Sequence, residues 1–256
     1  MLQQTQVDRV VPHYQRFMTA FPTPAACAAA GPAAVVRQWS GLGYNRRALN
    51  LHRAATVMVA EHGGRVPHDD TALRALPGVG PYTARAVRTF AFGDDIAAVD
   101  TNGVRVVARA VAGAPLSVRA ATVLGDRLVP AGRSWEFNQA MFDLGATVCT
   151  AARPDCARCP LARQCAWRRQ GAAAAGADPW RLSPTAKPQS AFEGSDRQGR
   201  GRLLDSLRQG AVRRSALAAA CGWPDNAARA ERVANAVVAE GFARWSGGKD
   251  PALRLR

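Results

Sequence analysis

Four cysteines within one short stretch constrain this 256-residue chain more than any other feature. They stand at Cys149, Cys156, Cys159 and Cys165, so that six, two and five residues separate successive members. The four histidines all lie between positions 13 and 68, so none is near enough in sequence to complete a mixed zinc site. Such crowding is typical of ligands for an inorganic centre in a reducing compartment, and it is unlike the disulfide framework of a secreted protein.

The spacing favours a 4Fe-4S cluster over a four-cysteine zinc site. Zinc sites of that type commonly have two Cys-x2-Cys pairs, whereas this chain has one such pair flanked by unequal gaps. The zinc alternative stays open on the pattern alone. Five arginines lie close to the ligands in sequence: Arg153, Arg158, Arg163, Arg168 and Arg169. They predict either a surface that faces phosphates or an ordinary surface exposed to solvent.

The charge of the chain points to a polyanionic partner. Lysine and arginine together number 34 against 19 acidic residues, which gives a net charge of +15. Only Lys187 and Lys249 are lysines, so no lysine amine is available as a nucleophile before position 187. No stretch approaches the roughly 18 to 20 apolar residues of a membrane span, and no leader with a cleavage site is evident, so we expect a cytoplasmic protein.

Apolar residues recur at helical spacing through about the first 170 residues. The expected helices lie at 1–20, 24–30, 32–40, 45–62, 69–76, 80–92, 101–112, 117–130 and 134–146, separated by glycine and proline. Strand-like alternation is nearly absent there, so we expect an all-α fold. We place one helical domain at 1–130, a cysteine-loop domain at 131–170, a linker at 171–200 and a C-terminal module at 201–256.

The C-terminal module has a mixed pattern. Apolar residues within 203–207, 216–220 and 233–238 predict three short helices. The stretches 242–245 and 252–255 flank a Gly-Gly-Lys-Asp turn that is typical of a β-hairpin. Three helices and a hairpin predict a small winged-helix-like α+β module.

Two further motifs have both a functional and a purely structural explanation. In Leu76-Pro77-Gly78-Val79-Gly80-Pro81-Tyr82, two close glycines precede a proline at the expected start of a helix. The backbone N–H groups there could bind a phosphate, although a simple helical corner would need the same glycines. Asp100 is well placed as the N-cap of the next helix, and equally well placed to stabilise a developing positive charge.

Together these stretches resemble the adenine DNA glycosylase family of the helix-hairpin-helix superfamily, over about residues 1–170. Besides the cysteine loop and the hairpin, the resemblance rests on Met1-Leu2-Gln3-Gln4-Thr5-Gln6-Val7, Gly41-Leu42-Gly43-Tyr44, Val99-Asp100-Thr101-Asn102 and Phe137-Asn138-Gln139-Ala140-Met141-Phe142-Asp143-Leu144-Gly145. It implies a six-helix helix-hairpin-helix domain plus an iron-sulfur cluster domain. The implied activity is monofunctional hydrolysis of the glycosidic bond of adenine mispaired with 8-oxoguanine or guanine. The implied partner is double-stranded DNA that contains the mispair. The protein itself is expected to be a monomer, associated with the nucleoid and not with a membrane.

The resemblance also implies roles for individual residues. Asp100 matches the carboxylate that stabilises the sugar cation, with Asn102 and Asp143 as polar neighbours. Tyr82 stands where the bifunctional endonuclease III branch has its lysine nucleophile, which disfavours a Schiff-base lyase. The implied DNA contacts are Gln3 as a wedge, Gln4 beside the adenine pocket, Tyr44 as an intercalating aromatic, and Leu76, Gly78, Val79 and Gly80 of the hairpin.

Two departures from the family pattern bear on function. The family's general acid is a glutamate two residues before the methionine that matches Met1, so we expect residues N-terminal to Met1 to supply it. Asp8, the nearest carboxylate, would point elsewhere on the helix. The residues after 170 are too few and too helical for the Nudix-like domain that many members use to recognise 8-oxoguanine. The alternative functions are a noncatalytic lesion-binding protein and a glycosylase for oxidised pyrimidines.

Overall fold

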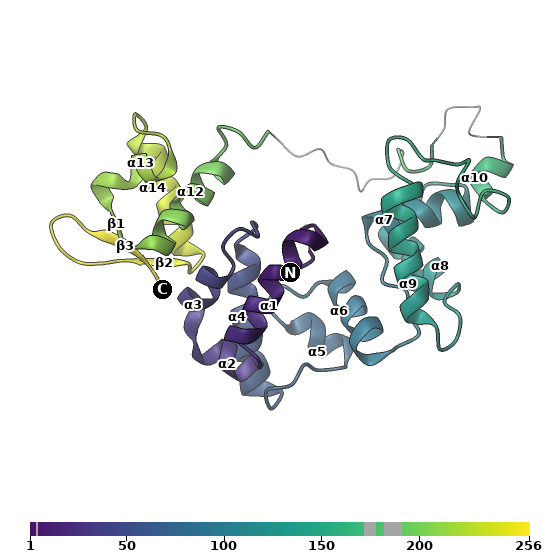
Figure 1. Ribbon diagram of the computed structural model, residues 1–256, viewed down its shortest axis with the longest axis horizontal. Helices are drawn as coiled ribbons and strands as arrows, with labels where there is room; N and C mark the ends of the chain where they lie inside the picture. Colours follow the sequence, from purple (N-terminus) through teal and green to yellow (C-terminus); the bar gives the residue numbers. More distant parts are fainter. Residues whose placement is uncertain (4, 172–177, 182–190) are drawn as a thin grey trace. The chain divides into compact units, whose positions relative to one another are not determined.

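The computed structural model describes residues 1–3, 5–171, 178–181 and 191–256, whose regular secondary structure is helical apart from one small sheet (Figure 1). The predicted mostly helical fold class is confirmed. The chain forms two compact units. The first comprises Met1–Pro67, Leu76–Gly78 and Ser190–Arg256, and the second comprises His68–Ala75 and Val79–Gln189. No helix in the described part of the chain is both long enough and apolar enough to span a membrane.

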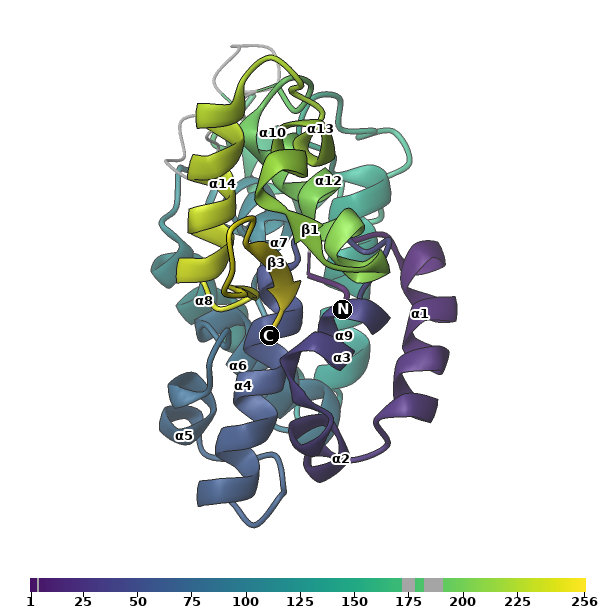
Figure 2. The ribbon, with the colours of Figure 1, turned by 90° about the vertical axis from the view of Figure 1, so that its left-hand side faces the viewer.

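Four helices begin the first unit (Figure 2): α1 (Val7–Ala20), α2 (Pro24–Ala29), α3 (Gly31–Gln38) and α4 (Arg46–Glu61). Helix α2 starts where the Thr23 hydroxyl accepts a hydrogen bond from the backbone N–H of Ala26 at 3.1 Å. The expected helix at 1–20 was wrong at its start, since α1 begins only at Val7. The carbonyls of Met1 and Gln3 instead accept hydrogen bonds from the guanidinium of Arg47, which holds this segment outside the helix.

The C-terminal part of the first unit has the predicted three helices and hairpin. Its elements are α12 (Asp196–Gln209), β1 (Val212–Arg213), the 3-10 turn η4 (Arg214–Ala216), α13 (Leu217–Cys221), α14 (Ala227–Ala239), β2 (Ala243–Trp245) and β3 (Ala252–Leu255). All strand pairs are antiparallel, in the order β1-β3-β2. Strand β1 was not predicted, because two residues are too few to show an alternating pattern.

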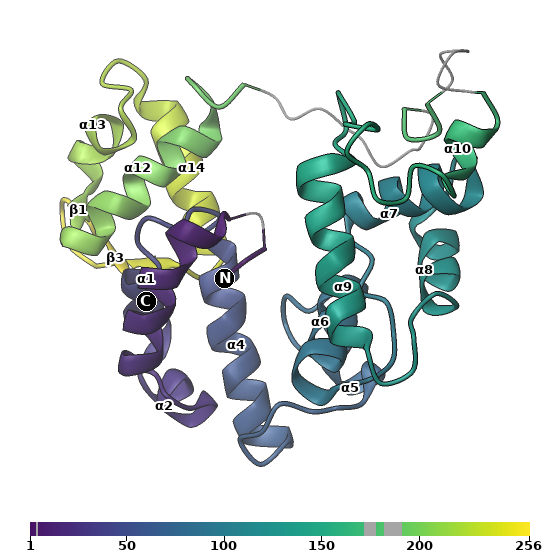
Figure 3. The same ribbon diagram turned by 45° about the vertical axis from the view of Figure 1, so that its right-hand side comes forward.

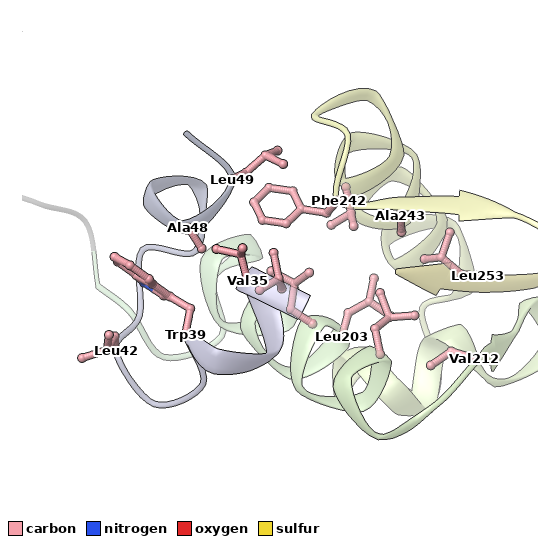
Figure 4. Packing of buried hydrophobic residues seen from close by; sticks show 14 of the residues in the cluster. Val35, Trp39, Leu42, Ala48, Leu49, Leu203, Val212, Phe242, Ala243 and Leu253 are labelled. Atoms are coloured by element: carbon pink, nitrogen blue, oxygen red, sulfur yellow. The ribbon is translucent and has the colours of Figure 1, made fainter. Parts of the chain in front are cut away.

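One apolar core joins the C-terminal helices and strands to the N-terminal helices of the same unit. Leu203 and Phe242 are buried in the same cluster as Val35, Trp39 and Leu49, as the close view shows (Figure 4). Polar contacts reinforce this packing. Arg208 donates to the carbonyl of Val36 at 3.1 Å, and Arg53 donates to the carbonyl of Glu240 at 2.8 Å. The C-terminal module therefore shares the core of the first unit.

The second unit is helical throughout its regular structure (Figure 3). Its α-helices are α5 (Asp70–Ala75), α6 (Pro81–Val87), α7 (Thr101–Val107), α8 (Val118–Asp126), α9 (Ser134–Asp143) and α10 (Ala166–Arg169). A π-helical turn continues three of them: η1 (Arg88–Phe92) follows α6, η2 (Ala108–Ala112) follows α7, and η3 (Leu144–Val148) follows α9. Such turns are rare and occur frequently at functional sites.

Glycines allow close packing around the segment that leads into α7. A Cβ atom on Gly125 would lie 2.9 Å from the Cβ of Ala97, and one on Gly145 would lie 2.8 Å from the Cβ of Asn102. Trp180 belongs to the buried cluster of this unit, although it falls in the stretch expected to be a linker. The second unit is thus tightly packed against Asn102 and against Val99 and Val104, which stand on either side of Asp100 in sequence.

Candidate active site and cysteine loop

Asp100 is the N-cap of α7. Its backbone is extended, and its Oδ1 accepts a hydrogen bond from the backbone N–H of Gly103 at 2.7 Å. The segment just before it is held by the buried side chain of Asn138 on α9. The Oδ1 of Asn138 accepts from the N–H of Ala98 at 2.6 Å, and its Nδ2 donates to the carbonyl of Ile96 at 2.9 Å. Both ends of the turn that carries the Asp100 carboxylate are therefore fixed.

Tyr82 lies in the first turn of α6, and its side chain is 37% exposed. Burial of the remainder raises the pKa of its phenol, and the negative charge of Asp100 raises the pKa further. The phenol is thus within electrostatic reach of the Asp100 carboxylate. A tyrosine kept neutral in this position can donate a hydrogen bond, but it is a poor nucleophile.

Arg105 connects Asn102 to the first cysteine of the loop. Its Nη2 donates to the Oδ1 of Asn102 at 2.8 Å and to the carbonyl of Gly145 at 2.7 Å. Its Nε donates to the carbonyl of Cys149 at 2.7 Å, and the residue is only 3% exposed. Asp143, the other predicted neighbour, is exposed and makes no hydrogen bond to Asp100 or Asn102. The structure therefore ties Asn102, and not Asp143, to the cysteine loop.

The four cysteines of the loop are free thiols that line a single pocket. Arg109, Trp167 and Arg168 line the same pocket. The Sγ of Cys149 accepts a hydrogen bond from Nη1 of Arg109 at 3.5 Å, and the Sγ of Cys165 donates to the carbonyl of Arg109 at 3.4 Å. Within the described residues, no group of three or more His, Cys, Asp or Glu side chains is arranged to hold a metal ion.

The buried guanidinium of Arg109 gathers the backbone around the first cysteine. It donates to the carbonyls of Thr150 at 2.7 Å and Ala151 at 3.2 Å, and it lies 5.3 Å from the ring centre of Trp167. Its charge is balanced by Asp178, which lies in the stretch expected to be a linker. The cysteine loop is thus held by Arg109 of η2, and Asp178, which follows the loop in sequence, pairs with that arginine.

Tyr44 of the first unit lies in a strained loop. It has a φ of 44°, in the left-handed region that only a few per cent of residues other than glycine adopt, and its side chain is 47% exposed. Arg47 lies 5.5 Å from its ring centre and donates to the carbonyls of Leu42 at 3.1 Å and Gly43 at 3.3 Å. The same side chain donates to the hydroxyl of Thr5 at 2.8 Å. Arg47 therefore holds both the loop that presents Tyr44 and the segment that includes Gln3.

The hairpin residues differ in accessibility. Leu76 is buried, Val79 is half-buried, and Gly78 and Gly80 are exposed. Gly78 has a φ of +82°, and a Cβ there would lie 2.8 Å from the Cβ of Asn50, so only glycine fits. Gly80 is the N-cap of α6 and has open space around it. Gln3 is exposed, whereas Gln4 lies outside the described residues.

Comparison with known proteins identifies the chain. The model of the HhH-GPD superfamily of base excision DNA repair proteins matches residues 1–116. The adenine DNA glycosylase of Mycolicibacterium smegmatis is 41% identical over 245 residues, which are 94% of this chain and 80% of that protein. That of Mycobacterium tuberculosis H37Rv is 43% identical over 94% of this chain and 78% of its own length. The chain belongs to the adenine DNA glycosylase family.

Solved structures of other DNA repair enzymes have a similar fold. A thermostable thymine-DNA glycosylase is 32% identical with a TM-score of 0.62, over 66% of this chain and 80% of that one. Endonuclease III in a trapped covalent intermediate with DNA is 26% identical with a TM-score of 0.56, over 66% and 80% of the two chains. As a member of the adenine DNA glycosylase family, the chain is an N-glycosylase of base excision repair.

Sequence reasoning missed four residues that organise this family member's sites: Arg47, Arg105, Arg109 and Asn138. The two arginines of α7 and η2 had a visible signal, because they interrupt an otherwise apolar helical run at a spacing of four residues. Charges in such a run are seldom buried unless they are paired. Arg47 gave no comparable signal, and Asn138 was noted only as one residue of the stretch from Phe137 to Gly145, with no role of its own.

Proposed function

We propose that this chain hydrolyses the N-glycosidic bond of adenine mispaired with 8-oxoguanine or guanine in double-stranded DNA, with Asp100 stabilising the sugar cation. Two mycobacterial relatives at about 42% identity are named for adenine DNA glycosylase activity. Endonuclease III, which has the same fold, has been solved with DNA. The observation that carries the proposal is the Asp100 carboxylate, fixed on both sides and close to Tyr82.

The reaction develops a negative charge on the leaving base and a positive charge on the sugar, and both must be stabilised. As the bond between the sugar C1′ and the adenine nitrogen breaks, its electron pair leaves with the base, which must gain a proton, and the sugar is left as an oxocarbenium-like cation. A carboxylate aimed at that cation stabilises it electrostatically until water adds to C1′ and loses a proton. We assign this stabilisation to Asp100, and the positioning of its surroundings to Asn102 and Tyr82. Asp143 makes no hydrogen bond to Asp100 or Asn102, so its assignment rests on the sequence resemblance alone.

Strand cleavage is not part of the proposed reaction. A lyase needs an amine that attacks C1′ to form a Schiff base, and the residue at this point of α6 is Tyr82. Both lysines of the chain, Lys187 and Lys249, come after the second unit's helices in sequence. We therefore expect the product to be an intact strand with an abasic site, and borohydride to trap no covalent complex.

DNA contacts are assigned to exposed residues of the candidate site. Tyr44, held in its strained conformation by Arg47, has the exposure that an intercalating ring requires. Gln3 is held nearby through its backbone, and Gln4 is assigned from the sequence alone. In the hairpin, Gly78 and Gly80 can bring backbone N–H groups to a phosphate. Leu76 is buried and Val79 half-buried, so they support the hairpin rather than face the duplex.

We assign a 4Fe-4S cluster to Cys149, Cys156, Cys159 and Cys165. The assignment is supported by four free thiols around one pocket, with Arg109 hydrogen-bonded to the first and last of them, although the described thiols are not arranged as a set of metal ligands. Bound there, the cluster would cross-link the two ends of the cysteine loop. Iron analysis of the purified protein should find about four irons per chain and a broad absorbance near about 400 nm. A colourless protein with one zinc would overturn this assignment.

The test of the activity compares Asp100→Asn with Asp143→Asn in the full protein. Asparagine is as good an N-cap as aspartate, so Asp100→Asn keeps the helix start and removes only the charge. Adenine release in a single turnover on an 8-oxoguanine:adenine duplex should fall by about 10²–10³-fold, as it does when one strong electrostatic group is lost. Asp143→Asn should change the rate by less than about tenfold.

The alternatives give different results in the same assay. Equal losses of adenine-release rate in the two variants would show that Asp100 does not stabilise the sugar cation. Release of an oxidised pyrimidine from a thymine-glycol duplex, with no adenine release, would reassign the substrate. Tight binding of the 8-oxoguanine:adenine duplex with no base release would indicate a noncatalytic binding protein.

A further inference from the structure

We propose that the outer face of the C-terminal sheet binds the phosphate backbone of duplex DNA, as a second contact surface separate from the glycosylase site. The surface consists of Arg213 on β1, Arg244 on β2 and Arg254 on β3. This arginine face has no part in the proposed reaction.

The three arginines share one face because of the strand register. Arg244 and Arg254 are direct cross-strand partners, and Arg213 is the partner of Ala252, two residues before Arg254. Since side chains alternate along a strand, Ala252 and Arg254 point away from Leu253, which is buried in the core. All three arginines are exposed. The arginine face is therefore the solvent side of the sheet.

The arrangement is unfavourable for the isolated protein. Like charges directly opposite each other on antiparallel strands repel, and here no carboxylate offsets them. None of the three arginines forms an ion pair with any residue in the described part of the chain. The neighbouring acids are engaged elsewhere: Glu231 pairs with Arg214, and Asp250 accepts a hydrogen bond from the hydroxyl of Ser215 at 3.0 Å.

Protection of sheet edges does not explain these residues. Charged side chains on edge strands commonly prevent strands of different molecules from pairing, and β1 and β2 are both edges. Arg254, however, lies on β3, the central strand, where no edge needs protection. A polyanion that neutralises the face accounts for all three positions.

The chemistry of the face favours DNA over a protein or a membrane. Protein interfaces and membrane anchors need exposed apolar or aromatic side chains, and the large exposed apolar residues of the described chain all lie at or before Phe192. Guanidinium groups bind phosphate oxygens through paired hydrogen bonds. The chain belongs to a family of DNA repair enzymes, so duplex DNA is the polyanion that it meets.

The test measures the salt dependence of binding to an undamaged duplex, so it does not depend on catalysis. Each phosphate contact contributes about 0.9 to the slope of log affinity against log salt concentration. The triple variant Arg213→Ala, Arg244→Ala, Arg254→Ala should therefore lower the slope by about 2.7, and each single variant by about 0.9. The matched control removes three exposed, unpaired arginines elsewhere, by Arg37→Ala, Arg119→Ala and Arg127→Ala.

Two results would overturn the proposal. One is an unchanged slope in the sheet variant, and the other is an equal fall in the control, which would show that only net charge matters. The triple lysine variant keeps the charges and should keep the slope, which guards against misfolding of the alanine variant. Lost binding to phosphatidylglycerol vesicles, with duplex binding unchanged, would assign the face to a membrane instead.

Discussion

Arg109 and Asp178 form a two-point ion pair, in which Nε donates to Oδ1 at 2.9 Å and Nη2 donates to Oδ2 at 2.5 Å. The arginine side chain is 1% exposed and the aspartate side chain 11%. Burial raises the pKa of the Asp178 carboxyl, but the hydrogen bonds and charge of Arg109, the backbone N–H of Trp180 and the charge of Arg181 together outweigh it, so the pKa lies below its usual value. The pair fixes the stretch after the cysteine loop to η2, the helical turn that also contacts Cys149 and Cys165.

Breaking this pair should destabilise the second unit. Asp178→Ala leaves a buried guanidinium without its counter-charge, which costs about 3–5 kcal/mol of unfolding free energy. The control is Asp196→Ala, since Asp196 pairs with Arg229 at 2.7 Å but its side chain is 63% exposed, and this change should cost less than about 1 kcal/mol. Urea unfolding followed by tryptophan fluorescence compares the two. Similar losses would show that Arg109 is satisfied without Asp178.

Arg47 should act on DNA through Tyr44. Both Arg47→Ala and Tyr44→Ala should weaken binding to an 8-oxoguanine:adenine duplex, because the first releases the strained loop and the second removes the ring. The double variant should lose less than the sum of the two single losses, with a coupling of about 0.5–3 kcal/mol. Arg46→Ala is the control, since Arg46 is exposed and pairs with Glu240 at 3.4 Å. If the two single losses in binding free energy add in the double variant, Arg47 does not act through Tyr44.

The hairpin should tolerate alanine at Gly80 but not at Gly78. Gly78→Ala forces a Cβ into a left-handed backbone and against Asn50, and it should cost more than about 1 kcal/mol of stability. Gly80→Ala meets open space and should have little effect. Adding Asn50→Ala removes the Nδ2 and Cγ atoms, 3.0 and 3.3 Å from the new Cβ, but keeps the Asn50 Cβ at 2.8 Å, so it should recover only a small part of the loss. Thermal unfolding measures all three, and full recovery would mean that the backbone conformation costs nothing.

The two cysteines outside the loop should be unreactive in the folded protein. Burial raises the pKa of both Cys27 and Cys221 to about 11, so fewer than about one thiol in a thousand is ionised at neutral pH. Iodoacetamide should label neither residue until urea unfolds the chain, as read by mass spectrometry. Because the folded pKa is raised, their contribution to stability is full below about pH 9 and is lost as the pH rises through about 11. Rapid native labelling would contradict this prediction.

Much of the helical fold could be predicted, because its helices end at glycine and proline and have clear apolar periodicity. Asp100 could be placed at a helix start from its neighbours alone, and the structure confirms it as an N-cap. The start of α1 could not be predicted in the same way, because it depends on Arg47, a residue more than forty positions from Met1 in sequence. The burial of Asp178 and Trp180 was equally hidden, since their polar and small neighbours are typical of a linker.

The shared core of the first unit limits how this family member can change. Leu203, Leu204 and Phe242 are buried in one cluster with Val35 and Val36, so the last sixty or so residues are as much a part of that core as the opening helices. Deleting them would expose an apolar surface and would leave Arg46 without its acidic partner Glu240. We therefore expect that this C-terminal segment cannot be exchanged by itself for that of a relative. It must evolve together with α3 and α4, and a hybrid enzyme would need matching substitutions on both sides of that contact.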